Sequence, residues 1–403
     1  MASELILQLQ NEDGTFCCEK YINFPSPRSA YIAICYTNTV GSRALADALK
    51  VKIIDFIARL DSAFSATTPP CSTTPKLFGD CLALNADHAT KLLLAVSDSV
   101  SNVFVNESLT DWPYVLLPVL KSGIPVTLQP PFNIPQVAFW NSNISEVIPV
   151  ICSVVGISDE DNRIFISYKR TDTAALAEQL FTRLHKEGFE VFLDRFSIDP
   201  GVNFQNRLYQ ELADKAMVVF LESPTFLTSK WIQLEIDFAK QYKLGYLAVN
   251  IAGSPKILSV DDENRRSVNL NIAAELDIPD LDDLIHDIKR QHTVALYRMR
   301  KYLSRNIEVA LQRSGVAPTV DSKGFITFRN QSKNVNYRIW PSARPPRLND
   351  YHYTDISEGS DVKIIVGPEF KEEMRERLNS WLAKKCLVEF YNEGQITDLI
   401  KLI

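Results

Sequence analysis

An indole and a carboxylate lie four positions apart at Trp231 and Glu235, within a stretch whose pattern predicts a helix over 230–241. Side chains at this spacing are neighbours on one helical face. A carboxylate placed there can stabilise positive charge that develops in a transition state, and an indole can pack on an aromatic ring of a ligand. On spacing alone, the favoured alternative is that Glu235 is an ordinary surface residue and Trp231 belongs to the core.

A second polar cluster follows the first predicted strand, at Tyr168, Lys169 and Arg170. Thr171 or Asp172 can cap the next helix, so backbone N–H groups and the helix dipole point to the same place. Arg170 and Lys169 could hold a pyrophosphate there. The alternative is a solvated basic turn, and for Lys169 the two interpretations are equally favoured.

Four short apolar runs rich in Ile, Val and Phe recur between residues 163 and 251, and each suits a strand buried on both faces of a parallel sheet. Helical patterns separate them, as where Leu176, Leu180 and Leu184 precede the stop signal Gly188. The predicted strands are 163–167, 191–193, 217–221 and 246–251, and the predicted helices are 174–186, 204–212 and 230–241. This alternation predicts a doubly wound α/β domain whose ligands bind beyond the carboxyl ends of the strands.

The same stretch carries a family resemblance. Its ordered segments are FISYKR, GFEVFLD with a loop that ends at Pro200-Gly201, SPTFLTSKW, and Trp231-x-x-x-Glu235. In this order and at this spacing they resemble the signature boxes of the TIR (Toll/interleukin-1 receptor) domain, over about a fifth of the chain. The last box resembles the NAD-cleaving branch of that family, which is found in the animal axon-degeneration NADase, plant immune receptors and bacterial anti-phage proteins.

The resemblance implies a flavodoxin-like parallel sheet and cleavage of NAD+ to nicotinamide and linear or cyclic ADP-ribose. Nicotinamide leaves as a neutral molecule, so one carboxylate suffices where ordinary glycosidases use a pair. With the resemblance, catalysis becomes the favoured role for Glu235. The implied substrate-binding residues are Trp231, Tyr168, Arg170, Phe204 and Leu208. For Phe204 and Leu208, burial against the core of their helix is slightly favoured over contact with the substrate.

Residues 194–201 resemble the BB loop of the family. The implied assembly loop comprises Phe196, Ile198, Pro200 and Gly201, of which the first two are apolar in a polar loop and so suggest contact with a neighbouring subunit. The loop is one residue longer than in the animal NADase, which leaves the role of Asp199 open. We therefore expect self-association through the TIR domain and an immune or anti-phage effector activated by assembly. The alternative is a non-enzymatic TIR scaffold.

Composition excludes several classes of protein. The chain has 403 residues, of which 46% are hydrophobic and 23% charged, and a formal charge of −6, which argues against bulk binding to nucleic acid or an anionic membrane. No signal-peptide or membrane-spanning pattern occurs, so we expect a cytoplasmic protein. The seven cysteines and five histidines lack zinc-like spacing, and no GxGxxG or P-loop occurs. We assign no metal and no cofactor, because NAD+ would be the substrate.

The flanks predict further domains. Residues 1–155 form an α/β domain with a regulatory or assembly role. Within it, 103–126 repeats the central order of strand, polar turn, Trp112, helix and strand, with Leu116 in the place of Glu235. One interpretation of this echo is a degenerate TIR-like fold that lacks the carboxylate. The favoured alternative is an unrelated α/β domain that shares a local pattern.

With the TIR domain at 160–255, residues 256–319 are predicted to be an acidic linker and a long helix over 282–313, and residues 320–403 a small α+β module. The module contains a hairpin of 324–329 and 335–340, strands at 361–366 and 386–391, and a helix at 369–384. Between its strands, 342–355 is basic and proline-rich and is predicted to be a surface loop. The long helix has a basic face, which is either solvated or a contact for nucleic acid together with the Arg344–Arg347 loop. The residues of that face are Lys289, Arg290, Arg298, Arg300, Lys301 and Arg305.

Overall fold

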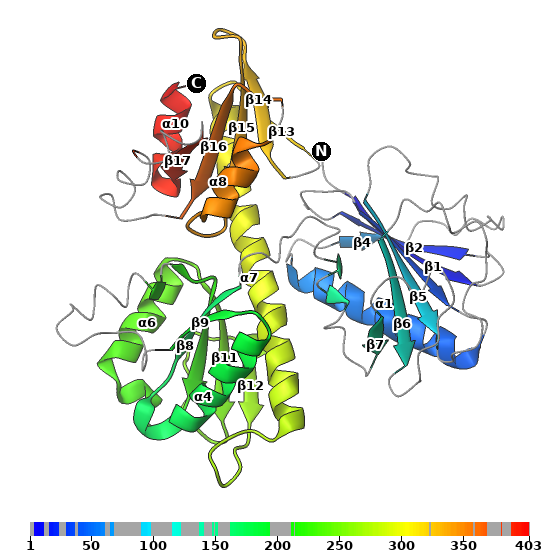
Figure 1. Cartoon of the computed structure of the whole chain (residues 1–403), viewed down its shortest axis with the longest axis vertical. Coiled ribbons are helices and arrows are strands. Elements are labelled where there is room, and N and C mark those ends of the chain that lie inside the picture. The colour runs from blue at the N-terminus through cyan, green and yellow to red at the C-terminus, as the bar shows by residue number, and fades with distance from the viewer. Residues whose placement is uncertain are drawn as a thin grey trace. The chain divides into compact units, whose positions relative to one another are not determined.

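The computed structural model comprises two compact units, one of residues 1–158 and 320–324 and the other of residues 159–319 and 325–403. Each is described by itself (Figure 1). The structure describes residues 4–11, 16–23, 30–36, 39–60, 65–67, 90–97, 115–121, 137–140, 147–148, 150–151, 162–193, 211–212, 214–321, 324–357, 359–368, 380 and 388–402.

The first unit contains a mixed sheet with strand order β4-β2-β1-β3-β5-β6-β7. The strands from β1 through β3, β5 and β6 to β7 are parallel, and β2 runs antiparallel to β1 and β4. Helix α1 (Val40–Leu60) buries a stripe that includes Leu49, Ile53 and Phe56. The strands are β1 (Glu4–Asn11), β2 (Phe16–Asn23), β3 (Ala30–Tyr36), β4 (Ser65–Thr67), β5 (Thr90–Ser97), β6 (Val115–Lys121) and β7 (Ala138–Trp140).

The predicted echo of the central domain is wrong where it requires a helix after Trp112. Leu116 lies in strand β6 and pairs with Leu93 of β5. The segment reads VLLPVLK, and Pro118 in its middle would cost a helix about 3 kcal/mol. A run of Val and Leu between two parallel strands is stable in a sheet, so Leu116 has no positional likeness to Glu235.

The central domain is built on a five-stranded sheet with order β12-β11-β10-β8-β9, in which every pairing is parallel. In chain order this is the 2-1-3-4-5 arrangement of doubly wound flavodoxin-like folds. The four predicted strands are confirmed, with bounds that differ by at most one residue. The strands are β8 (Arg163–Ser167), β9 (Glu190–Leu193), β10 (Met217–Glu222), β11 (Gly245–Ile251) and β12 (Arg265–Val268).

Both faces of this sheet are buried, which explains the unbroken apolar runs. Ile164 and Ile166 of β8 face helix α4 (Arg170–Lys186), whereas Phe165 faces helix α6 (Lys230–Gln241). Helix α6 has the predicted bounds, and α4 begins four residues before its predicted start. Of the predicted helix 204–212, residues 211 and 212 are described, and both are helical. Alternation along β8 therefore decides which helix each side chain meets.

The predicted boundary at residue 255 is too early. Strand β12 lies within the predicted acidic linker and pairs with β11. Helix α7 (Ile278–Arg313) then buries Leu284, Ile285 and Ile288 in the same core as α4. Strand β12 escaped prediction because its sequence, RRSV, is polar, as an edge strand permits. The central domain thus extends into α7.

The C-terminal module has a sheet with order β13-β14-β15-β16-β17, in which β14 and β15 form the predicted hairpin. The second half of α7 packs on it through Leu303, Ile307 and Leu311, together with helix α10 (Ile396–Leu402). Apart from Ser380, which is helical, the predicted helix 369–384 lies outside the described residues. The strands are β13 (Thr319–Val320), β14 (Ile326–Asn330), β15 (Val335–Pro341), β16 (Val362–Gly367) and β17 (Val388–Asn392).

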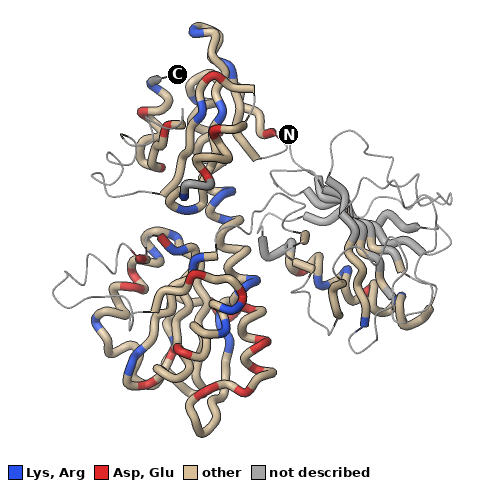
Figure 2. The backbone as a smooth tube through the Cα atoms, in the orientation of Figure 1, with Lys and Arg blue, Asp and Glu red and all other residues tan. Residues whose placement is uncertain are grey.

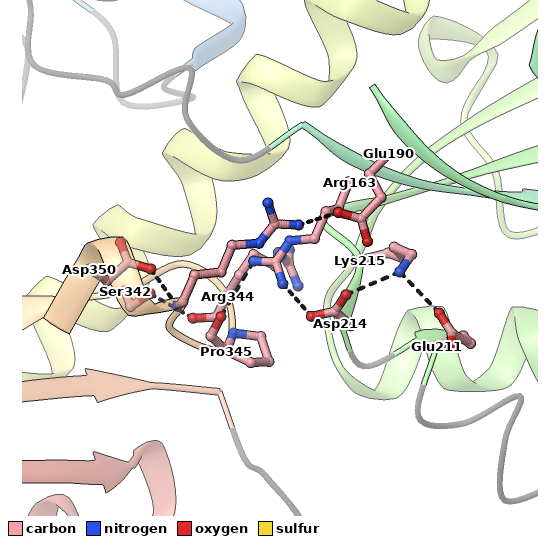
Figure 3. Close-up of polar contacts among 10 residues, drawn as sticks. Arg163, Glu190, Glu211, Asp214, Lys215, Ser342, Arg344, Pro345 and Asp350 are labelled. Carbon is pink, nitrogen blue, oxygen red and sulfur yellow. Dashed lines mark hydrogen bonds and ion pairs between the residues drawn. The ribbon is translucent and has the colours of Figure 1, made fainter. Parts of the chain in front are cut away.

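The segment 342–355 is not a surface loop. Residues 342–346 are buried, and helix α8 (Leu348–Asp355) follows them. Arg344 is 2% exposed and donates from Nη2 to the carbonyl oxygen of Ala216 at 3.1 Å, just before β10. Arg163, the first residue of β8, donates to the carbonyl of Pro345 at 3.4 Å and pairs with Asp214 (Figure 3). The segment is therefore buried because it docks on the amino-terminal edge of the central sheet.

Arg347 extends this contact by pairing with Glu190, the first residue of β9, at 2.6 Å. We name Arg163, Arg344 and Arg347 the arginine clamp. Beside it, Ala343 packs in a small apolar cluster with Ala216, Leu296 and Met299. Buried Lys215 pairs with Asp214 and Glu211, both at 3.1 Å, and Asp214 in turn pairs with Arg163 of the clamp. The clamp and α7 together join the module to the central domain.

Candidate functional site

Glu235 lies on the inward face of α6. The buried residues of this helix are Ile232, Glu235, Ile236, Phe238 and Ala239, and four of them follow the i, i+3, i+4 and i+7 spacing of one helical face. Ile232 and Ile236 pack in the core that contains Phe165 of β8, and Glu235 is only 7% exposed. A carboxylate in such a stripe is costly unless it is hydrogen-bonded, so its presence points to a role beyond stability.

Ser167 supplies a hydrogen bond to this carboxylate. It is the last residue of β8 and is 1% exposed, and its hydroxyl Oγ donates to Glu235 Oε2. Ser167 lies on the same side of β8 as Phe165, the side that α6 covers. Glu235 is thereby held at the carboxyl end of a parallel strand, the place where folds of this topology bind ligands.

A second set of contacts holds the turn that leads into α6. Lys169 donates from Nζ to Thr225 O at 3.0 Å, to Thr225 Oγ1 at 2.7 Å and to Thr228 Oγ1 at 2.8 Å. The carboxylate oxygen Oδ2 of Asp172 accepts from Ser223 Oγ at 2.7 Å, from Thr225 N at 3.1 Å and from Thr225 Oγ1 at 2.6 Å. We call these five residues the loop strap. It joins the start of α4 to the short helix η3 (Phe226–Thr228) that precedes α6.

The strap also defines the electrostatics of the α4 N-terminus. Burial raises the pKa of the Asp172 carboxyl, but hydrogen bonds from Thr225, Ser223 and Thr171 outweigh it and hold that pKa well below its usual range. The resulting negative charge lies in the first turn of α4, where it complements the helix dipole. Lys169 donates three hydrogen bonds within the strap, which favours a structural role over the predicted pyrophosphate contact. Arg170, the first residue of α4, is exposed.

The structure places one of the predicted substrate-binding residues, Tyr168, on the side of the sheet away from Glu235. Tyr168 is 8% exposed and packs with Ile164 and Ile166 in the core on the α4 side of the sheet. A prediction that had followed the alternation of β8 would have selected Ser167, because alternate side chains of a strand point to opposite faces. Ser167 is thus the residue that sequence reasoning missed. The signal was the alternation of side chains along RIFISY, which places Ser167 on the same side of the strand as Phe165.

Trp231 is placed differently from the alternative that spacing alone favoured. It is 44% exposed in the first turn of α6, whereas Glu235 is buried. The alternative, in which Glu235 lies on the surface and Trp231 in the core, is therefore wrong. An exposed indole one turn before a buried carboxylate is accessible to a ligand ring.

The remaining predicted site residues lie outside the described residues. They are Phe204 and Leu208 of the substrate set, with Phe196, Ile198, Asp199, Pro200 and Gly201 of the assembly loop.

Glu222, at the carboxyl end of β10, is another buried carboxylate near the site. Its oxygens accept from Asn250 Nδ2 at 2.8 Å and from the backbone N–H of Ile257 at 2.7 Å. Arg265 of β12 pairs with it at 3.1 Å. This set of partners holds β10, β11 and β12 together, so Glu222 has a structural role and Glu235 remains the candidate for chemistry.

The basic face of α7 is partly used within the protein. Lys289 pairs with Glu187 at 3.0 Å, and Arg290 pairs with Asp287 at 2.8 Å. The guanidinium of Arg300 lies over the ring of Trp340, 5.0 Å from its centroid. Figure 2 shows residues of both signs along this helix. These contacts weaken the prediction of a nucleic-acid surface there. Within the part of the chain that the structure describes, no helix is long and apolar enough to cross a membrane.

Comparison with known proteins identifies the central domain. The model of the TIR domain family matches residues 164–284. The 2′ cyclic ADP-D-ribose synthase BtTIR of Bacteroides thetaiotaomicron is 25% identical over 133 residues, which cover 31% of this chain and 44% of that protein. The NAD(+) hydrolase TcpA of Theionarchaea archaeon (strain DG-70-1) is 27% identical over 97 residues, covering 24% of this chain and 27% of that protein.

The chain thus spans less than half the length of each of these two curated relatives. A solved structure, the TIR domains of the activated Roq1 resistosome that recognizes the pathogen effector XopQ, is 16% identical, with a TM-score of 0.23. The matched region covers 34% of this chain and 84% of the chain in that structure. The family match and the parallel 2-1-3-4-5 sheet coincide in the same residues. Residues 164–284 are a TIR domain.

Proposed function

We propose that this chain is a TIR-domain NAD+ glycohydrolase with Glu235 as its catalytic residue. The observation that carries the proposal is the burial of Glu235 on the inward face of α6, with its carboxylate bonded to Ser167 at the carboxyl end of β8. The similarity to an NAD(+) hydrolase and to a cyclic ADP-ribose synthase supports the same chemistry. The TIR domain family model matches residues 164–284, the stretch that contains Ser167 and Glu235.

The proposed reaction breaks the bond between the ribose C1′ and the pyridinium nitrogen of NAD+. The bonding electron pair passes to that nitrogen, so neutral nicotinamide leaves without a general acid. The Glu235 carboxylate stabilises the oxocarbenium ion that forms on the ribose. Attack by water, with loss of its proton, gives ADP-ribose, whereas attack by a nucleophilic atom of the same molecule gives a cyclic product. Trp231 packs on a ring of the substrate, and Arg170 pairs with its pyrophosphate.

The wider role follows from the same proposal. The protein is an immune or anti-phage effector of the cytoplasm, silent until its TIR domains self-associate through the loop 194–201. Depletion of NAD+ or a cyclic ADP-ribose signal is the output. Residues 1–155 have the regulatory or assembly role in this scheme.

The test compares matched variants of α6. The purified 403-residue chain, at concentrations where light scattering shows self-association, is incubated with NAD+, and mass spectrometry measures the release of nicotinamide and ADP-ribose. We expect turnover by the wild type and by Asp237→Asn, an exposed carboxylate two residues further on, and none by Glu235→Gln. Self-association without turnover identifies a non-enzymatic scaffold instead. Equal turnover by Glu235→Gln refutes the catalytic assignment.

A further inference from the structure

We infer that Ser167 is a positioning residue for the proposed reaction, which acts by fixing the orientation of the Glu235 carboxylate. This inference rests on the proposed NAD+ cleavage and adds a residue to it. Ser167 Oγ donates to Glu235 Oε2, and the two residues come from different elements, β8 and α6. Both side chains are buried, so water competes little for the hydrogen bond.

The backbone of Glu235 is held independently of this hydrogen bond. Ile232 and Ile236, on either side of Glu235, pack in the core beneath α6. The loop strap fixes the turn before the helix through Lys169 and Asp172. Removing the Ser167 hydroxyl therefore leaves α6 in place and changes only what holds the carboxylate.

The carboxylate itself has freedom that α6 does not remove. A glutamate side chain has three rotatable bonds, and the last one sets which direction each oxygen faces. A hydrogen bond to Oε2 selects one orientation before the substrate binds, so no reorganisation is needed as charge develops on the ribose. Because this benefit is largest in the transition state, its loss lowers kcat and leaves KM nearly unchanged.

The experiment uses Ser167→Ala to delete the donor and Ser167→Thr to restore a hydroxyl at the same place. Ser357→Ala is the matched control, because Ser357 is also buried and its hydroxyl donates to Thr354 O at 2.6 Å within the C-terminal module. Thermal unfolding of each variant of the 403-residue chain is measured beside its kcat and KM for NAD+. A hydrogen bond to a charged group predicts a loss in kcat of about 10-fold to 100-fold for Ser167→Ala.

We expect this loss in Ser167→Ala, substantial recovery in Ser167→Thr and wild-type kcat in Ser357→Ala. An unchanged kcat in Ser167→Ala, or a rise in KM alone, overturns the inference while turnover by the wild type upholds the proposed function. Absence of turnover by the assembled wild type overturns both.

Discussion

The arginine clamp makes a quantitative prediction about the junction of the C-terminal module and the TIR domain. Replacing Arg344 by Ala removes a charged donor from Ala216 O and the packed stem of a side chain that is 2% exposed. The lost hydrogen bond costs about 1.5–3 kcal/mol. The lower end applies, because Ala216 O also accepts from the backbone N–H of Gly245 at 3.1 Å and stays satisfied.

The stem of Arg344 adds to this cost. Because alanine keeps Cβ, two buried methylene groups are lost at about 0.8 kcal/mol each, so Arg344→Ala should destabilise the protein by about 3 kcal/mol in total. Arg344→Met keeps most of the apolar stem and no charge, and it should cost about 1–2 kcal/mol, close to the hydrogen bond alone. The difference between the two variants therefore separates the packing contribution from the polar one.

The assay is urea unfolding of the full chain, followed by tryptophan fluorescence. Arg347→Ala is the control, because Arg347 and Glu190 form an exposed pair that should contribute less than about 1 kcal/mol. The clamp lies at the amino-terminal edge of the sheet, opposite Glu235, so the turnover number of the folded variants should match the wild type. If Arg344→Ala costs no more than Arg347→Ala, the docking described for residues 342–346 is wrong.

Two further predictions concern the loop strap and the approach of α7 to the sheet. The pKa of the Asp172 carboxyl is lower in the folded protein than in the unfolded chain, where it is about 3.9. The charged carboxylate therefore stabilises the fold at pH values above about 3.9, and this contribution is lost as the pH falls further. Asp172→Asn should therefore unfold at lower urea than the wild type at pH 7, with a difference that shrinks below pH 4; a constant difference would contradict the argument. Gly245→Ala should destabilise by about 1–3 kcal/mol, because its new Cβ would lie 2.2 Å from Ala295 Cβ. In thermal melts, adding Ala295→Gly should recover part of that loss.

Periodicity predicted four of the five strands of the central sheet, together with helices α4 and α6. β8, β10 and β11 are buried on both faces, so their apolar runs stand out from the polar helix surfaces between them. α6 repeats its inward residues at helical spacing. β12 carried no such signal, because an edge strand can be polar and one of its arginines, Arg265, faces the buried carboxylate of Glu222.

The sequence allowed the prediction that Glu235 is the functional carboxylate, but not the prediction of how the side chains around it are arranged. Spacing placed Glu235 on α6, yet it could not show that Glu235 is inside and Trp231 outside, because that depends on the rotation of the helix against β8. The burial of Arg344 was beyond sequence reasoning for a similar reason. Its acceptor, Ala216 O, lies 128 positions earlier in the chain, and a basic proline-rich segment otherwise suggests exposure.

Helix α7 contributes to two hydrophobic cores, with Leu284 and Ile288 in the TIR domain and Leu303 and Ile307 in the C-terminal module. Its 36 residues span about 54 Å, and each residue advances the face by about 100°. Inserting or deleting one residue near Arg298 would therefore turn one stripe away from its core while the other stays in place. The fixed rotation between the two stripes therefore constrains the length of α7. The helix should tolerate substitutions on its exposed face far better than the insertion or deletion of one residue.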